Sequence, residues 1–177
     1  MSLSYRRLDV DELARVGEID RTEAIDMLYV QEGGSLREVR GDFSAAPWAP
    51  VGTGEHSVAA QRAELARYVE KGAVCIGAFD DRLIGIGVVL AHLRSGVAQL
   101  AYLYVTDGRR GEGVGSTLTD ELERLAREAG SRSMVVSATP SRNTVDFYRR
   151  RGYAPMAEPL SELYELEPED IHLDKTL

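Results

Sequence analysis

A glycine-rich turn carries the chemistry that this sequence suggests most directly. From Val105 to Leu118 the chain reads Val-Thr-Asp-Gly-Arg-Arg-Gly-Glu-Gly-Val-Gly-Ser-Thr-Leu. Glycines at 111, 113 and 115 let successive backbone N–H groups point at one spot, and a following helix brings the positive end of its dipole there. Arg109 and Arg110 add positive charge beside the turn. The stretch therefore predicts a site for a phosphate or a pyrophosphate.

The flanking patterns place this turn between a strand and a helix. Residues 100–105 form an apolar run with strand character, whereas Leu118, Leu122 and Leu125 recur at helical spacing. A strand-to-helix connection can need glycine for packing alone, so the turn by itself leaves that interpretation open. The dinucleotide fingerprint G-x-G-x-x-G does not fit, and no G-K-[ST] closes the turn as in a nucleotide P-loop.

A second stretch, residues 140–152, reads as a helix that Ser141 caps and Gly152 ends. Ser141 and Tyr148 are about two turns apart and share a face with Thr144. The strands before this helix and before the glycine turn are expected to be parallel neighbours, which form a crevice where ligands of open sheets bind. Tyr148 then points toward the ligand, or packs with Phe147 in the core.

Together the two stretches resemble the signature motifs of the GNAT superfamily of N-acetyltransferases. The coenzyme A signature [Q/R]-x-x-G-x-[G/A] stands here as Arg110-x-x-Gly113-x-Gly115, and residues 143–153 are similar to N-x-x-A-x-x-F-Y-x-x-x-G-[F/Y]. The resemblance implies acetyl-CoA as cosubstrate and transfer of its acetyl group to a primary amine of a small molecule or protein, by direct attack in a ternary complex. It implies Tyr148 as the general acid that protonates the departing thiolate. The implied coenzyme-binding residues are Leu103, Tyr104, Val105, Arg110, Gly111, Glu112, Gly113, Val114, Gly115, Ser116, Ser141, Thr144 and Tyr148.

The chain departs from the family pattern at the positions that often hold a base. Gln99 and Ala101 stand where some relatives carry a glutamate or a paired histidine, and Ser141 stands where an asparagine often contacts the coenzyme. His92, on a neighbouring strand, is the best-placed group that titrates between pH 5 and 8 and is the tentative base. A core histidine, a water relayed through Gln99 or Tyr102, and an amine that arrives unprotonated are the alternatives.

The missing base motivates a second hypothesis, in which the chain binds acyl-CoA without turnover as a sensor or interaction module. A plain nucleotide binder is a third possibility.

Composition and charge disfavour several other classes of protein. The chain has 177 residues, 44% hydrophobic and 28% charged, which is typical of one globular domain. Its net charge of −8 disfavours nucleic acid as a partner. The sequence holds no apolar run long enough to span a membrane and no secretory h-region near the start, so a cytoplasmic protein is expected. Cys75 lies in an apolar run and is expected to be a buried thiol, and the scattered histidines 56, 92 and 172 imply no metal.

The predicted architecture is a single α/β domain of the α+β type over residues 1–177. The family fold implies three layers, with a mixed, mostly antiparallel sheet of about six or seven strands and about four helices, splayed between two central parallel strands. Residues 73–153 form the expected coenzyme A-binding core. Expected strands are 4–8, 73–79, 83–93, 97–106, 133–138 and 171–175, and expected helices begin at Asp9 or Asp11 and near residues 57, 115 and 141.

Residues 20–56 are expected to form a variable segment on the acceptor side. Two short runs around Gly33 and Gly34 predict a β-hairpin, and residues 43–54 read as a loop. Trp48 in that loop either pins the segment to the core or forms a wall of the acceptor site. A free edge of the hairpin could pair with a second copy of the chain, so a homodimer is possible.

Overall fold

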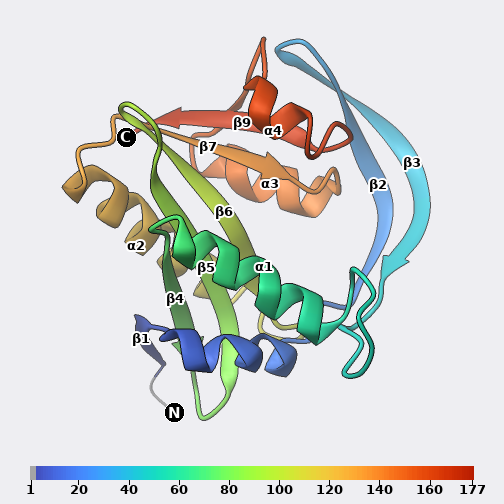
Figure 1. The fold of residues 1–177 in the computed structure, drawn as a ribbon. Helices are drawn as coiled ribbons and strands as arrows, with labels where there is room; N and C mark the ends of the chain where they lie inside the picture. Colours follow the sequence, from blue (N-terminus) through green and yellow to red (C-terminus); the bar gives the residue numbers. More distant parts are fainter. Residues whose placement is uncertain (1–2) are drawn as a thin grey trace.

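The computed structural model describes residues 3–177, and its main layer is a seven-stranded sheet. The strands are β1 (Ser4–Arg7), β4 (Val74–Phe79), β5 (Leu83–Arg94), β6 (Val97–Val105), β7 (Ser133–Ala138), β8 (Ala154–Pro155) and β9 (Ile171–Thr176). Their order in the sheet is β1-β4-β5-β6-β7-β9-β8 (Figure 1). Adjacent strands are antiparallel, except that β6 and β7 are parallel. The predicted mixed, mostly antiparallel sheet is therefore confirmed.

Helices cover both faces of this sheet, which makes three layers. On one face lie the 3-10 helix η1 (Val10–Glu18) and α1 (Val58–Glu70), whose buried side chains pack in one apolar cluster with β4 and β5. On the other face, α2 (Val114–Glu128) and α3 (Arg142–Arg150) share a second cluster with β6, β7 and β9. The short α4 (Ser161–Tyr164) precedes β9. The predicted helix after Asp9 is thus a 3-10 helix, with the capping box of Asp9 and Glu12 at its start.

Residue patterns explain why these elements form. The residues of β5 from Leu83 to Leu90 are all buried, as expected for a central strand that is covered on both faces. In α2, Val114, Leu118 and Leu122 recur at helical spacing, and each is at most 1% exposed. At Gly87 an added Cβ would lie 2.9 Å from a Leu122 methyl, so the absent side chain lets α2 approach the sheet closely.

The predicted hairpin is present as a separate two-stranded sheet of β2 (Glu23–Glu32) and β3 (Ser35–Ala45). The strands pair from Glu32↔Ser35 to Glu23↔Ala45. The prediction that the loop starts at residue 43 was therefore wrong by three residues, because these residues pair across the hairpin with the start of β2.

Hydrogen bonds attach the hairpin to the rest of the domain. The Tyr29 N–H donates to the Pro140 carbonyl over 2.8 Å, just before α3. Near the turn, the Gln31 amide donates to the Met156 carbonyl at 2.8 Å and accepts from the His172 N–H at 2.7 Å. In Figure 1 the hairpin stands at the side of the domain, next to β9 and α3. The hairpin, which belongs to the segment of residues 20–56 predicted to be variable, is thus held beside the carboxyl end of β7.

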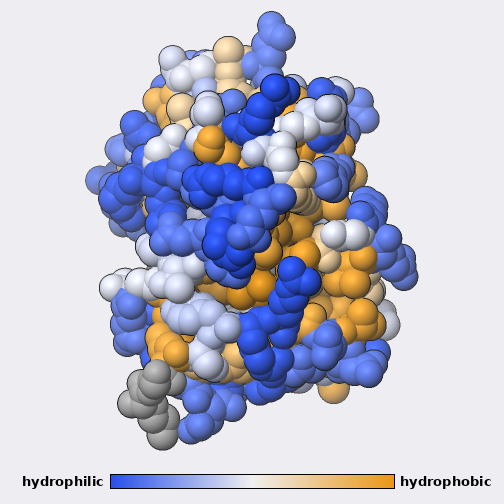
Figure 2. Space-filling model, turned by 90° about the vertical axis from the view of Figure 1, so that its left-hand side faces the viewer, coloured by the Kyte–Doolittle hydropathy of each residue, from blue (hydrophilic) through white to orange (hydrophobic). Residues whose placement is uncertain are grey.

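The outer surface is mostly polar. Figure 2, which shows the side at the left of Figure 1, is dominated by hydrophilic side chains with a narrow hydrophobic band between them. A hollow of 380 Å³ lies between β1 and α2, lined by Tyr5, Arg6, Arg7, Ile76, Thr117, Asp120, Glu121 and Arg124. Among residues 3–177, no helix is both long and apolar enough to cross a lipid bilayer.

Candidate active site

The sheet opens between its two parallel strands. β6 and β7 pair only from Val97↔Ser133 to Gln99↔Val135. Beyond Gln99, β6 keeps β5 as its partner on one side, up to Gly85↔Val105, and is not paired with β7 on the other. Along that edge the backbone of β6 has no strand partner beyond Gln99 in the described part of the chain, and the Val105 carbonyl accepts from Arg110 at 3.2 Å.

The glycine turn forms the N-terminal end of α2. Gly111 and Gly113 have φ values of +85° and +87°, which only glycine adopts at low cost. Gly113 is the N-cap of α2 and has no side chain to accept from the first-turn N–H groups. An added Cβ on Gly115 would lie 3.5 Å from Phe147 and 3.6 Å from Val105, so this turn packs between β6 and α3. Within residues 3–177 no side chain caps the first-turn N–H groups of α2, and N–H groups at a helix N-terminus, together with the helix dipole, favour an anion.

Both arginines of the turn are held by acceptors of the chain itself. Arg109 pairs with Glu112 at 2.7 Å and with Asp80. The Arg110 guanidinium donates to the Thr22 carbonyl at 3.0 Å and to the Val105 carbonyl at 3.2 Å. Arg110 therefore connects the glycine turn to the segment before β2. Its charge remains beside the anion site, although its donors are already in use.

Tyr148 is the buried phenol at this end of the sheet. It is 4% exposed, and its ring packs edge-on against Phe147 and Tyr153. Burial, and secondarily the neighbouring Tyr104, raise the pKa of Tyr148, so the phenol is protonated at neutral pH. Within residues 3–177 its hydroxyl has no hydrogen-bond partner, whereas the hydroxyl of Tyr153 donates to Glu123 at 3.1 Å.

The Ser141 hydroxyl is used inside its own helix cap. It accepts from the Thr144 N–H at 3.3 Å and donates to the Thr144 hydroxyl at 2.9 Å. Ser141 is 1% exposed, and its backbone forms an isolated bridge with Leu28 of β2. The predicted cap is confirmed, and β2 covers it.

The structure does not bring His92 to this site. His92 is exposed on β5 between the pairs Leu90↔Gln99 and Arg94↔Val97, which lie at the start of β6. Tyr148 interacts with Tyr104, at the other end of β6. Gln99 is 5% exposed and lies near Tyr68 of α1. The predicted acid and the tentative base are therefore separated by most of the length of β6.

Trp48 and a group of charged residues that sequence reasoning missed lie around Tyr104. The Trp48 ring meets Tyr104 edge-on, with centroids 5.3 Å apart, and is 6% exposed, so the predicted pinning of its loop is confirmed. Burial raises the pKa of Tyr104 to about 12, opposed by Arg21 and assisted by three carboxylates. These carboxylates, called the acidic cluster below, are Glu64 of α1 with Glu167 and Asp170 of the segment before β9.

None of the three carboxylates forms an ion pair within residues 3–177. Glu64 reads in the sequence as part of the polar face of α1, and Glu167 and Asp170 as part of an acidic tail. No local pattern signals that they meet, because they are brought together only by the packing of α1 and the tail around β6.

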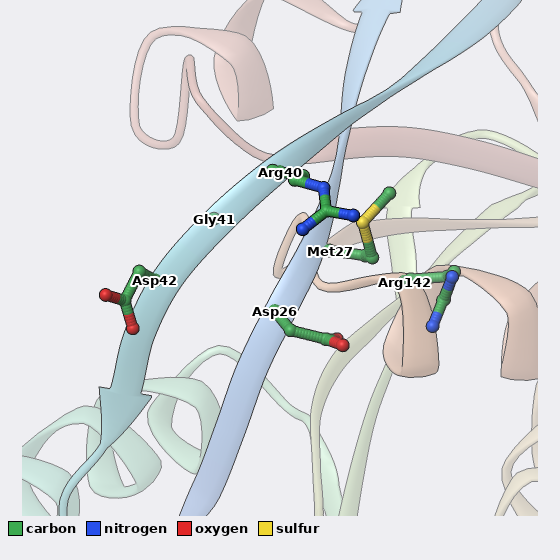
Figure 3. A pocket seen from close by; sticks show the side chains of 6 residues that line it. All are labelled: Asp26, Met27, Arg40, Gly41, Asp42 and Arg142. Carbon is green, nitrogen blue, oxygen red and sulfur yellow. The ribbon is translucent and has the colours of Figure 1, made fainter.

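A hollow of 620 Å³ lies elsewhere, between the hairpin and the start of α3. Figure 3 shows Asp26 and Arg142 projecting from different elements into the same space, while Asp42 projects away. Its lining residues are Asp26, Met27, Arg40, Gly41, Asp42 and Arg142, none of which belongs to β6 or the glycine turn. We therefore do not place the chemistry there.

The chain is similar to known acetyltransferases. A family model described as the acetyltransferase (GNAT) family matches residues 41–153. A crystal structure of nourseothricin acetyltransferase is 19% identical, with a TM-score of 0.71 over 98% of this chain and 96% of that one. The PaiA N-acetyltransferase of Thermoplasma acidophilum, solved with coenzyme A, is 18% identical with a TM-score of 0.64 over the whole of both chains. Among curated protein sequences, none is significantly similar to this chain.

Proposed function

Because this chain belongs to the GNAT acetyltransferase family, we propose that it is an N-acetyltransferase that moves the acetyl group of acetyl-CoA to a primary amine of a small molecule or protein. One observation carries the proposal. Tyr148 is a buried, protonated phenol whose hydroxyl has no hydrogen-bond partner within residues 3–177. It lies on α3 next to Phe147, which packs against Gly115 in the turn at the N-terminus of α2. Similar folds have been solved with coenzyme A bound, which supports the cosubstrate.

The coenzyme is proposed to lie along the open edge of β6. Residues 111–116 would hold its pyrophosphate through backbone N–H groups, with Arg110 adding charge. Backbone groups of residues 103–105 would bind the pantetheine arm and polarise the thioester carbonyl, as in an oxyanion hole. The hydroxyls of Ser141 and Thr144 are hydrogen-bonded to each other. These two residues would therefore line the coenzyme site through the first turn of α3, and not through free hydroxyl groups. Residues 73–153 thus form the coenzyme half of the site.

The reaction is a direct attack in a ternary complex. The amine nitrogen donates its lone pair to the thioester carbonyl carbon, the C–N bond forms, and the C–S electron pair leaves with sulfur. Tyr148 gives its proton to the thiolate, and the nitrogen gives a proton back to the Tyr148 phenolate as the amide forms. A phenol that is already desolvated can supply this proton without first breaking a hydrogen bond to the protein.

The surroundings of Tyr104 favour an amine acceptor. The acidic cluster has no ion-pair partner within the described residues and borders aromatic rings, and such sites attract ammonium groups. Trp48, from the segment 20–56, packs against the same tyrosine. This supports the assignment of that segment to the acceptor side. Similar structures are named for antibiotic acetylation, but at 18–19% identity they support the fold and not a particular acceptor.

A coupled assay tests the proposal. Purified protein and acetyl-CoA are incubated with a panel of polyamines, antibiotic amines, amino acids and peptides, and free thiol is measured. We expect release with at least one amine. Tight acyl-CoA binding without turnover on any amine, and without an effect of Tyr148→Phe on binding, would support the alternative, a sensor or interaction module. Preference for ATP over coenzyme A in calorimetry would contradict both.

A prediction on coenzyme binding concerns Gly113. Gly113→Ala places a side chain at φ +87° with nothing within 4 Å of its Cβ, so it introduces backbone strain of about 1–2 kcal/mol without a clash. Relief of that strain shifts the first-turn amides of α2. We expect the calorimetric Kd for coenzyme A to rise about tenfold, or about 1.4 kcal/mol.

Gly130→Ala is the matched control for this variant. Gly130 ends the same helix with φ +90°, and its Cβ would also meet nothing within 4 Å. It should lose the same stability with an unchanged Kd. Equal affinity of both variants for coenzyme A would place the pyrophosphate elsewhere.

A further inference from the structure

Asp170 is a titratable side chain to which the reaction described above gives no proton-transfer role. It directly precedes Ile171, which pairs with Ala138 at the carboxyl end of β7. That is the end at which β7 separates from β6. From there its charge reaches Tyr104 on β6 and helps to raise the pKa of that tyrosine. The strand register therefore places Asp170 at the end of β7 where the two parallel strands have separated.

The Asp170 carboxylate has no partner within the described residues. Its backbone N–H donates to the Glu167 carbonyl at 3.2 Å, but no hydrogen bond or ion pair engages its side chain. Burial, and secondarily the charge of Glu167, raise the pKa of Asp170 from its ordinary value of 3.8 to about 7. Glu167 is more exposed than Asp170, so its carboxylate is more easily solvated by water. A half-buried carboxylate with no partner is costly unless it serves a ligand.

Several titratable and charged groups lie around Asp170. Glu167 lies on the same segment, and Glu64 of α1 and Arg21 act on the same Tyr104. His172 follows two residues later. Burial lowers the pKa of His172, and its ring nitrogens lie within hydrogen-bond distance of the Glu167 carbonyl and the Ser137 hydroxyl. Its ring is thus already engaged.

Tyr104 is coupled electrostatically to both groups. The charge of Asp170 helps to raise the pKa of Tyr104, and Tyr104 in turn helps to raise the pKa of Tyr148. A thioester carbonyl placed along β6 beside Tyr104 would therefore have a proton donor and a proton acceptor within the same small region.

On the premise of the proposed acetyltransferase activity, we propose that Asp170 is the general base that takes a proton from the acceptor amine. The acceptor binds as an ammonium ion and gives one proton to the Asp170 carboxylate. Its lone pair forms the C–N bond, the C–S pair leaves on sulfur, and Tyr148 protonates sulfur. The second proton of the nitrogen returns to the Tyr148 phenolate, and Asp170 releases its proton to water. The products are the amide and free coenzyme A.

The test compares Asp170→Asn with Asp174→Asn, an exposed aspartate on β9 that touches no part of the site. With the best amine from the panel, kcat is measured from pH 5.5 to 9. Wild type should show a rise of slope one around pH 7, because a base must lose its proton to act. We expect Asp170→Asn to lower kcat about 100-fold and to remove this rise, while Asp174→Asn stays within twofold. Asp170→Glu should keep the rise and recover part of the rate.

A second readout needs no activity. The pKa of Asp170 in the folded chain lies above its ordinary value, so its contribution to stability is present below about pH 4 and lost as pH rises through 7. Asp170→Asn should therefore become more stable than wild type as pH rises across that range, and Asp174→Asn should not. If the difference in stability between Asp170→Asn and wild type does not change between pH 4 and pH 7, the Asp170 carboxylate does not have the raised pKa that burial gives it.

The outcomes separate this inference from the proposed function. If wild type and Asp170→Asn turn over an amine equally, or both keep the rise near pH 7, Asp170 is not the base and the acetyltransferase assignment stands. If wild type acetylates no amine, both proposals are wrong.

Discussion

Tyr148→Phe is expected to bind acetyl-CoA as tightly as wild type and to turn over at least about 100-fold more slowly. The substitution removes only a hydroxyl that has no hydrogen-bond partner within residues 3–177. The ring can keep its edge-on contacts with Phe147 and Tyr153, at centroid distances of 5.2 Å and 5.5 Å. Stability should therefore hardly change, and the loss should appear in kcat. Steady-state kinetics together with calorimetric Kd values check this.

Tyr153→Phe is the matched control. Tyr153 belongs to the same aromatic stack, but its hydroxyl donates to Glu123 at 3.1 Å. Removing it should lower stability by about 1 kcal/mol and leave kcat within twofold. A kcat for Tyr148→Phe close to that of wild type would remove the general acid from the mechanism.

Because burial raises the pKa of Tyr148 above the range of the assay, its phenol stays protonated throughout. A rise in kcat between pH 6 and 8 therefore cannot come from Tyr148. The pH profile of kcat therefore reports the base, because the acid, Tyr148, does not change its protonation over the pH range of the assay.

Glu123→Ala is expected to destabilise the fold by about 3 kcal/mol. Glu123 lies in α2 and is 3% exposed. Its two oxygens accept from the Lys175 ammonium at 2.9 and 2.8 Å, and the Tyr153 hydroxyl adds a third bond. Removing the carboxylate leaves the ammonium of β9 unpaired and largely covered, which costs more than the ion pair contributes. Urea denaturation, with comparison of m values, measures the change.

Glu121→Ala, two residues earlier in α2, provides the comparison. Glu121 pairs with Arg124 at the surface, where both side chains are at least one-third exposed. Such pairs contribute less than about 1 kcal/mol. A loss below about 1 kcal/mol for Glu123→Ala would mean that water solvates Lys175 once its partner is gone.

The elements proposed to hold the coenzyme are local in sequence, so the elements themselves were predictable. The strand of residues 97–105, the glycine turn and α2 are consecutive, and Tyr148 follows from the spacing of one helix. Each of these elements is formed by residues that are close together in the sequence. The spacing of the apolar residues and the positions of the glycines therefore predict it.

The other half depends on distant contacts. Asp170 and Glu64 act on Tyr104 although each comes from a different element, and Trp48 reaches the same ring from a loop. His92 was a plausible base because it lies on the strand next to β6, but the pairing register places it at the wrong end.

The sequence alone determined the family, the order of the main strands and helices, and the phenol at residue 148. Only the tertiary structure decided where the hairpin packs, where β6 and β7 separate, and which carboxylates gather at the opening. The physical reason is that periodicity reports which face of an element is buried. It carries no information on which distant element covers that face, which depends on strand order and register across the whole sheet.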